Sequence, residues 1–306
     1  MGFKVIHPGL LSLLQDSGRF GYQNIGITNG GPMDEHAYHW CNHLLNNPVN
    51  TNVLEITFGL LKLEVTKATN IALTGADLGA RLNDKPLAVW SSYTVKPGDQ
   101  LSFEQPINGL RAYLGVTGGF TCTPQLGSCS TVIREQLGGM NSQGLPLKAG
   151  DVVPFLVSRP MVHQKTPEWA IENYDEPLEL GVIKGYQYND FSVAGRRDFF
   201  HSTYSITQHI DRMGYRLNGK AISCQRDGII SEGIAFGAIQ IPGNGQPIIL
   251  MRDRQTIGGY PKIGTLGGLG ASRLAQRLPD QEVSFRPMDI SEAEIERRLF
   301  IRTFCN

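Results

Sequence analysis

The densest group of side chains capable of chemistry occupies residues 252–262, Arg-Asp-Arg-Gln-Thr-Ile-Gly-Gly-Tyr-Pro-Lys, directly after the apolar segment 247–251. An apolar strand that ends in charged, amide and hydroxyl groups with paired glycines is typical of a site at a strand end. Arg254 offers a planar fork and Lys262 a point charge, and both groups bind carboxylates or phosphates. We therefore predict catalytic roles for Arg254 and Lys262.

The residues between these two cations supply further contacts that a ligand needs. Paired glycines let backbone amides approach a ligand closely, and an amide side chain donates a hydrogen bond to a carbonyl group. The alternative is a charged hairpin with an internal Asp–Arg pair. On the first interpretation, the predicted substrate- or nucleotide-binding residues are Gln255, Thr256, Gly258, Gly259 and Tyr260.

A second polar cluster lies in the segment Gln-Asp-Ser-Gly-Arg at 15–19, with Asp34 following it along the chain. A carboxylate at Asp16 or Asp34 could act as a base or bind a substrate amine. Structural roles compete with this interpretation, because Asp-Ser-Gly is a turn sequence and Asp34 precedes a helical pattern as a cap would. We retain Asp16, Arg19 and Asp34 as predicted binding residues.

Other candidate motifs carry less weight. His36, His39 and His43 share one helix face and could reach a metal ion, but no acidic or cysteine ligand is paired with them, so we favour a solvated polar face and predict no metal site. The hydroxyl-rich segment 126–131 lacks a G-x-S-x-G elbow. The sequence also contains no G-x-x-x-x-G-K-[ST] loop and no H-E-x-x-H motif.

The elements that position these residues are predicted to be mostly strands. The 36 glycines and 17 prolines are spread along the chain, which suits short strands joined by turns and not long helices. A helix is predicted over 33–46, and two more are predicted over 271–277 and from Ser291, where Ser-x-x-Glu forms a capping box. The apolar face predicted for the first helix consists of Ala37, Trp40, Cys41, Leu44 and Leu45.

The length of 306 residues predicts two domains. We assign the first to 1–165, with the 33–46 helix and a long loop excursion over 117–150. We assign the second to 175–306, which carries the 252–262 cluster, and the polar, proline-containing segment 160–177 is the predicted linker.

Three pairs of segments also match in the same order. They are 19–26 with 212–219, 56–63 with 234–241, and 97–103 with 279–285. Such repetition indicates a duplicated β unit, and therefore a pair of similar barrels or sandwiches.

The composition limits the classes of partner and the cellular compartment that we predict. Lys and Arg number 28, equal to Asp and Glu, so no basic surplus exists for nucleic acid or for a membrane surface, and neither is a predicted partner. The N-terminus lacks a signal-peptide core, and no run approaches 18 apolar residues. Five cysteines without a C-x-x-C motif predict reduced thiols and a cytoplasmic location.

Several long stretches resemble the motifs of one family. The family is that of the C subunit of 5-oxoprolinase, also called the allophanate hydrolase subunit 2-like or biotin-dependent carboxyltransferase-like family. The resemblance runs from about residue 4 to residue 287. The matching stretches are Asp253-Arg254-Gln255-Thr256-x-Gly258-Gly259-Tyr260-Pro261-Lys262-Ile263, Gln15-Asp16-x-Gly18-Arg19-x-Gly21, Gly31-x-Met33-Asp34, Leu126-Gly127-Ser128-x-Ser130-Thr131, Arg212-Met213-Gly214-Tyr215-Arg216-Leu217 and Gly245-Gln246-Pro247.

The resemblance implies a mainly β fold of two tandem cyclophilin-like antiparallel β-barrel domains with a few short helices. It implies a multi-subunit complex, with partners that resemble the A and B subunits of 5-oxoprolinase, that hydrolyses the small lactam 5-oxoproline to glutamate at the expense of ATP. The chain would then be an ATP-dependent amide hydrolase subunit, active only with its partners. ATP, with Mg²⁺, would bind in this chain or in a partner subunit.

The same resemblance leaves two alternative functions open. One is a carboxyltransferase that moves CO₂ from carboxybiotin to urea or a similar amide. The chain has no Met-Lys biotinylation site, so we expect no covalent biotin on it. The other is a non-enzymatic role as regulatory binding partner of the B-like protein, a kinase inhibitor.

Overall fold

The computed structural model describes residues 2–226 and 228–304 and divides them into two compact units. Unit 1 contains residues 2–20 and 30–175. Unit 2 contains residues 176–304 together with 21–29, a short segment from near the start of the chain. No helix within the described residues is long and apolar enough to cross a membrane.

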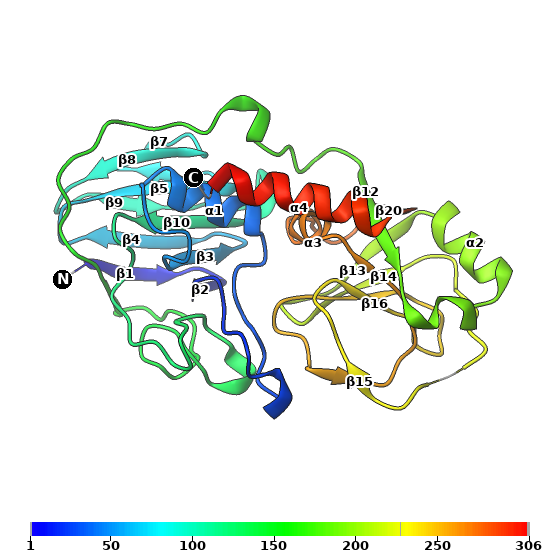
Figure 1. Cartoon of the computed structure of the whole chain (residues 1–306). Coiled ribbons are helices and arrows are strands. Elements are labelled where there is room, and N and C mark those ends of the chain that lie inside the picture. The colour runs from blue at the N-terminus through cyan, green and yellow to red at the C-terminus, as the bar shows by residue number, and fades with distance from the viewer. Residues whose placement is uncertain (1, 227, 305–306) are drawn as a thin grey trace. The chain divides into compact units, whose positions relative to one another are not determined.

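Unit 1 consists of two antiparallel sheets (Figure 1). Their apolar side chains form one hydrophobic core. Its strands are β1 (Gly2–Pro8), β2 (Leu11–Gln15), β3 (Val53–Thr57), β4 (Leu61–Val65), β5 (Thr69–Asp77), β6 (Arg81–Leu82), β7 (Lys85–Pro86), β8 (Ser91–Val95), β9 (Gln100–Ser102), β10 (Asn108–Val116) and β11 (Val152–Pro154). The strand order is β11-β1-β4-β9-β6-β7 in one sheet and β2-β3-β10-β5-β8 in the other.

Helix α1 (Glu35–His43) packs on β5 and β10 (Figure 1). These two strands are therefore buried on both faces, one toward the core and one toward the helix. The predicted apolar helix face is confirmed, because all five of its residues are buried. The helix is shorter than the predicted 33–46, because Asp34 forms its N-cap and Asn46 has a φ of +53°.

The segment predicted as a loop excursion contains no strand between β10 and β11 in the described chain. Its one regular element is the 3₁₀ turn η2 (Ile133–Glu135). A similar turn, η3 (Glu168–Ala170), lies in the predicted linker.

Unit 2 is a closed barrel of seven strands in the order β12-β19-β16-β17-β14-β13-β20. Its strands are β12 (Leu178–Lys184), β13 (Tyr204–Ile210), β14 (Gly214–Asn218), β16 (Ala238–Gln240), β17 (Ile248–Leu250), β19 (Lys262–Leu266) and β20 (Glu282–Pro287), and β15 (Glu232–Gly233) pairs with β18 (Ile257–Gly258) outside the ring. The predicted mainly β fold is thus confirmed, with one parallel pair, β12 with β20. A ring of seven strands cannot alternate direction all the way round, so at least one pair must be parallel.

The helices of unit 2 are α2 (Val193–His201), α3 (Gly268–Leu274) and α4 (Ile290–Phe304), with 3₁₀ turns η1 (Gln23–Ile25) and η4 (Tyr186–Asp190). The sequence predicted α3 and α4 but not α2, which has few apolar residues at helical spacing. Helix α4 begins before Ser291, because the amide of Ala293 already donates to the Asp289 carbonyl group. Ser291 therefore lies inside the helix, and the prediction that it caps the helix is wrong.

Two of the three repeated segment pairs adopt the same local structure. Gly59 precedes β4 and Gly237 precedes β16, with φ values of +82° and +79°. Gly98 and Asp280 likewise take positive φ values before β9 and β20. The third pair differs, because 212–219 contains β14 whereas 19–26 contains only η1.

Gly59 and Gly98 provide a matched test of backbone packing. Both have positive φ, but an added Cβ would overlap the Glu104 carbonyl oxygen at Gly59 and would meet nothing within 4 Å at Gly98. We expect Gly98→Ala to lower the free energy of unfolding by about 1–2 kcal/mol through backbone strain, and Gly59→Ala by more than about 3 kcal/mol. Urea unfolding measures both, and equal losses would contradict the difference in packing.

Candidate functional site

The predicted cluster begins with three buried charged residues in unit 2. Arg252, Asp253 and Arg254 follow β17, and each is 6% exposed. Asp253 accepts two hydrogen bonds from Arg212, from Nε to Oδ2 at 2.8 Å and from Nη2 to Oδ1 at 2.9 Å. Such a bidentate pair is among the stronger charge-assisted contacts in proteins. Asp253 thus pairs with a residue from the turn between β13 and β14, and not only within its own segment.

Arg254 is held by neutral acceptors. Its Nε donates to the Ile234 carbonyl oxygen at 3.0 Å, Nη1 to that of Met251 at 3.3 Å, and Nη2 to Asn29 Oδ1 at 3.4 Å. The Thr28 hydroxyl donates to the Arg254 carbonyl oxygen at 3.0 Å. The three side-chain hydrogen bonds fix the guanidinium group in one orientation, and the Thr28 bond holds the backbone of Arg254.

The charge of Arg254 is not neutralised by a direct partner. No carboxylate of the described residues forms an ion pair with this guanidinium. Burial, with a further contribution from the nearby positive charge of Arg252, lowers the pKa of Arg254 to about 10, and Asp253 opposes this shift. The side chain therefore remains protonated at neutral pH and carries a buried positive charge.

Arg254 lines a cavity of about 560 Å³ in the barrel unit. A cavity of this size suits a small organic ligand. Gln255 and Tyr260 of the predicted set line the same cavity, and Tyr260 is 46% exposed. Strands β13, β14, β16 and β17 contribute the remaining walls.

Lys262 lines a different cavity, of about 620 Å³, in the same unit. Its Nζ pairs with Glu232 and donates to the Gly233 carbonyl oxygen at 3.1 Å. The hydrogen bond from Lys262 lowers the pKa of the Glu232 carboxyl group. The structure thus places the two predicted catalytic cations, Arg254 and Lys262, on two cavities and does not bring them together.

The other predicted residues of this segment have structural contacts. The Thr256 carbonyl oxygen accepts from the Ile234 amide at 3.0 Å, and the Gly259 carbonyl oxygen accepts from the Ile229 amide at 2.8 Å. Gly258 pairs with Glu232 in the β15–β18 ladder. Gly258 thus belongs to the small β15–β18 sheet, whose residues Glu232 and Gly233 line the Lys262 cavity, and Gly259 follows this sheet directly.

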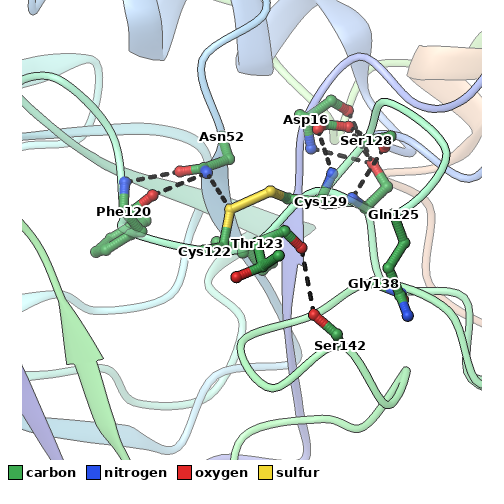
Figure 2. Close-up of a disulfide and its surroundings, with 12 residues drawn as sticks. Asp16, Asn52, Phe120, Cys122, Thr123, Gln125, Ser128, Cys129, Gly138 and Ser142 are labelled. Carbon is green, nitrogen blue, oxygen red and sulfur yellow. Dashed lines mark hydrogen bonds between the residues drawn. A yellow bond between two sulfur atoms is a disulfide. The ribbon is translucent and has the colours of Figure 1, made fainter.

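Asp16 and Arg19 organise the loop excursion of unit 1. Asp16 Oδ1 accepts from the Ser128 hydroxyl at 2.5 Å, and Oδ2 accepts from the Cys129 amide at 2.6 Å (Figure 2). Asp16 Oδ1 also accepts from the Gly18 amide at 2.9 Å. Arg19 Nη2 donates to the Ser130 carbonyl oxygen at 2.7 Å. The bond to Gly18 matches the turn that the sequence offered as an alternative.

Asp34 has the contacts of a helix cap. Its Oδ1 accepts from the Ala37 amide at 3.1 Å, and Oδ2 accepts from the Tyr174 hydroxyl at 3.2 Å. Its own amide donates to the Tyr113 hydroxyl at 2.8 Å, which in turn donates to Glu55 Oε2 at 2.8 Å. Asp34 is 1% exposed. Asp16 and Arg19 therefore contact the loop excursion, Asp34 lies at a helix start, and the other predicted residues lie in unit 2.

The cysteines overturn one prediction. Cys122 and Cys129 form a disulfide inside the loop excursion (Figure 2), so the expectation of reduced thiols is wrong for these two residues. Whole-chain reasoning from an odd cysteine count does not detect a bridge between residues only seven positions apart. Cys41 and Cys224 are free thiols, and Cys305 lies outside the described residues.

The three histidines lie on the α1 surface with other contacts. His36 Nε2 accepts from the Trp40 indole at 3.1 Å. Across the described chain, no group of three His, Cys, Asp or Glu side chains could hold a metal ion.

Two residues near Arg254, Arg212 and Gln240, were not among the site residues predicted from the sequence. Arg212 stands in one of the repeated motifs, which was a usable signal. Gln240 interrupts the apolar run Ala-Ile-Gln-Ile at 238–241, and a polar residue in an otherwise apolar strand is a second such signal.

The fold and the cavities define a two-unit β protein whose closed barrel presents a buried cation to a small-molecule cavity. The chain belongs to the family described as carboxyltransferase domain, subdomain A and B, whose model matches residues 25–287. It is 36% identical to the C subunit of 5-oxoprolinase from Escherichia coli over 95% of this chain and 92% of that protein. It is 33% identical to the C subunit of 5-oxoprolinase from Haemophilus influenzae over 93% of this chain and 91% of that protein.

A solved structure extends this similarity. The K. lactis urea amidolyase matches 100% of this chain with a TM-score of 0.93 at 27% identity. The chain spans only 20% of that enzyme. The similarity therefore covers one module of a much longer protein.

The Arg212–Asp253 pair can be tested against a surface pair. Asp253→Asn leaves Arg212 buried without its full counter-charge, and we expect a loss of about 3–5 kcal/mol in the free energy of unfolding. Asp198→Asn makes the same chemical change in a carboxylate whose partners, Lys220 and Arg197, are exposed, and there we expect a much smaller effect. Urea unfolding compares them, and a near-zero loss for Asp253→Asn would exclude a stabilising role.

The disulfide can be tested directly. Closing a loop between residues 122 and 129 should contribute about 2–3 kcal/mol through the entropy of the unfolded chain. Cys129→Ser and reduction of the unaltered protein should therefore lower stability by the same amount. Peptide mass spectrometry under non-reducing conditions should find Cys122 and Cys129 linked, and alkylation of both thiols without reductant would contradict the bridge.

Proposed function

We propose that this chain is one subunit of an ATP-dependent 5-oxoprolinase complex that hydrolyses 5-oxoproline to glutamate. The observation that carries the proposal is the match to two 5-oxoprolinase C subunits at 36% and 33% identity over more than nine-tenths of their length. The chain spans only 20% of the urea amidolyase that has a similar fold. The extent of the match favours the oxoprolinase role.

The reaction needs activation of a poor electrophile. Transfer of the γ-phosphoryl group of ATP to the lactam oxygen releases ADP and makes the ring carbon electrophilic. Water then adds to that carbon, and the C–N bond breaks as the nitrogen takes a proton. A second water molecule releases phosphate from the resulting acyl phosphate and leaves glutamate.

In this proposal, Arg254 holds the substrate carboxylate. The guanidinium is buried, hydrogen-bonded in a fixed orientation and without an ion pair among the described residues, so its attraction for an anion is little screened by water. Gln255 and Tyr260 line the same cavity and supply polar contacts. ATP, with Mg²⁺, is the phosphoryl donor, and partners that resemble the A and B subunits of 5-oxoprolinase complete the enzyme.

A carboxyltransferase is the second candidate. The family description and the TM-score of 0.93 to the urea amidolyase structure favour it. In that case the cavity would receive a carboxybiotin carried by another polypeptide and an amide acceptor. A purely regulatory role remains the outcome if neither reaction occurs.

The assay is 5-oxoproline-dependent release of phosphate from ATP by the chain purified with its partner subunits. We expect turnover that falls at least about 100-fold in Arg254→Met, because a buried charge-assisted contact is lost. Lys262→Met changes the other cavity, and a loss of turnover in this variant would show that the second cavity also contributes to the reaction. Absence of turnover with all partners present would overturn the proposal, and urea-dependent decarboxylation of carboxybiotin would favour the carboxyltransferase.

A further inference from the structure

Gln240 is a buried amide on the cavity that Arg254 lines. It ends β16, and the residue is only 6% exposed. Its Nε2 is buried and has no hydrogen-bond partner among residues 2–226 and 228–304. A buried donor without an acceptor carries a desolvation cost, so packing alone would favour an apolar side chain at this position.

The neighbouring glycine leaves room for this amide. A Cβ at Gly258 would lie 2.8 Å from Gln240 Nε2 and 2.5 Å from Ile234 Cδ1. The backbone of Gly258 is not in the left-handed region, so its conformation alone does not require glycine. The terminal torsion of a glutamine side chain has broad minima, and rotation about it can turn the N–H toward the cavity.

Two buried groups on this cavity therefore lack complementary partners within the described chain. Arg254 is a buried cation without an ion pair in the described chain, and Gln240 is a buried donor without an acceptor. The carboxylate of Asp211, on the same cavity, accepts from the amides of Met213 at 2.7 Å and Gly214 at 3.0 Å, so it is engaged in its own turn. An anion and a carbonyl oxygen on one small ligand would satisfy Arg254 and Gln240 together.

We propose that Gln240 is a specificity-determining residue, which donates a hydrogen bond to the carbonyl oxygen of a small carboxylic acid whose carboxylate binds Arg254. The ligand class is thus a carboxylate that also carries an amide or lactam carbonyl group. The choice of 5-oxoproline as the probe rests on the proposed function. Gly258 acts as a positioning residue, because its missing side chain lets the Gln240 amide turn.

Three ligands separate the two contacts in an NMR titration of the full chain, alone and with its partner subunits. 5-Oxoproline has both groups, 2-pyrrolidinone lacks the carboxylate, and proline lacks the lactam oxygen and has a protonated ring nitrogen. We expect the unaltered protein to bind 5-oxoproline about 10- to 100-fold more tightly than either analogue. Gln240→Met should reduce the preference for 5-oxoproline over proline and leave the preference over 2-pyrrolidinone unchanged. Arg254→Met should abolish the preference for 5-oxoproline over 2-pyrrolidinone.

Thermal unfolding distinguishes this role from a structural one. Gln240→Met removes an unpartnered buried donor and keeps the side-chain length, so we expect an unchanged or higher melting temperature. Gly258→Ala should weaken 5-oxoproline binding without weakening proline binding. Arg298→Ala, an exposed change on α4 outside the cavity, is the control that should leave all three affinities unchanged.

Two results would overturn the inference. One is a ratio of 5-oxoproline to proline affinity that Gln240→Met leaves unaltered, and the other is no binding of 5-oxoproline by the chain or its complex. If the complex turns over 5-oxoproline but Gln240→Met leaves the affinity ratio unaltered, only the role of Gln240 is refuted. A Gln240-dependent preference in a complex without turnover would refute the proposed function alone.

Discussion

The rest of the site depends on the bidentate pair between Asp253 and Arg212, which leaves Arg254 without an ion pair among the described residues. Both oxygens accept hydrogen bonds from Arg212, at 2.8 and 2.9 Å, so the next residue along the chain, Arg254, is left with carbonyl and amide oxygens. Neutral acceptors hold a guanidinium in place but do not cancel the electric field of its positive charge. Arg254 therefore brings to the cavity a buried positive charge that no carboxylate of the described residues pairs with directly.

The barrel makes this arrangement possible because it fixes both ends of each contact. Strand β14 follows the turn that carries Arg212, β17 precedes Arg254, and these two strands are hydrogen-bonded neighbours. Strand β16 pairs with β17 on its other side and places Gln240 on the same cavity. Three neighbouring strands of a closed ring thus determine the chemistry of one wall, and a closed ring leaves little freedom for any of them to shift.

Local patterns in the sequence were sufficient for several elements. The 3.6-residue period of α1, its Asp34 cap and the polar burst after β17 were all visible, because each depends on neighbours within a few residues. The sequence did not indicate that Arg254 and Lys262 line two different cavities. The chain passes through β18 between them and enters β19 at Lys262, so the distance along the sequence says little about which cavity each side chain lines. The Cys122–Cys129 bridge and helix α2 were not predicted for similar reasons. The path of the loop brings the two cysteines together, and tertiary packing determines where α2 forms.

The membership of residues 21–29 in unit 2 affects how the protein is made. Thr28 and Asn29 contact Arg254, which the ribosome adds more than two hundred residues later, |i−j| being 226 and 225. During synthesis this early segment must wait for nearly the whole barrel sequence before it finds its partners. For the same reason no single cut in the chain releases unit 2 intact, and a fragment that begins at residue 176 would lack two of the groups that hold Arg254.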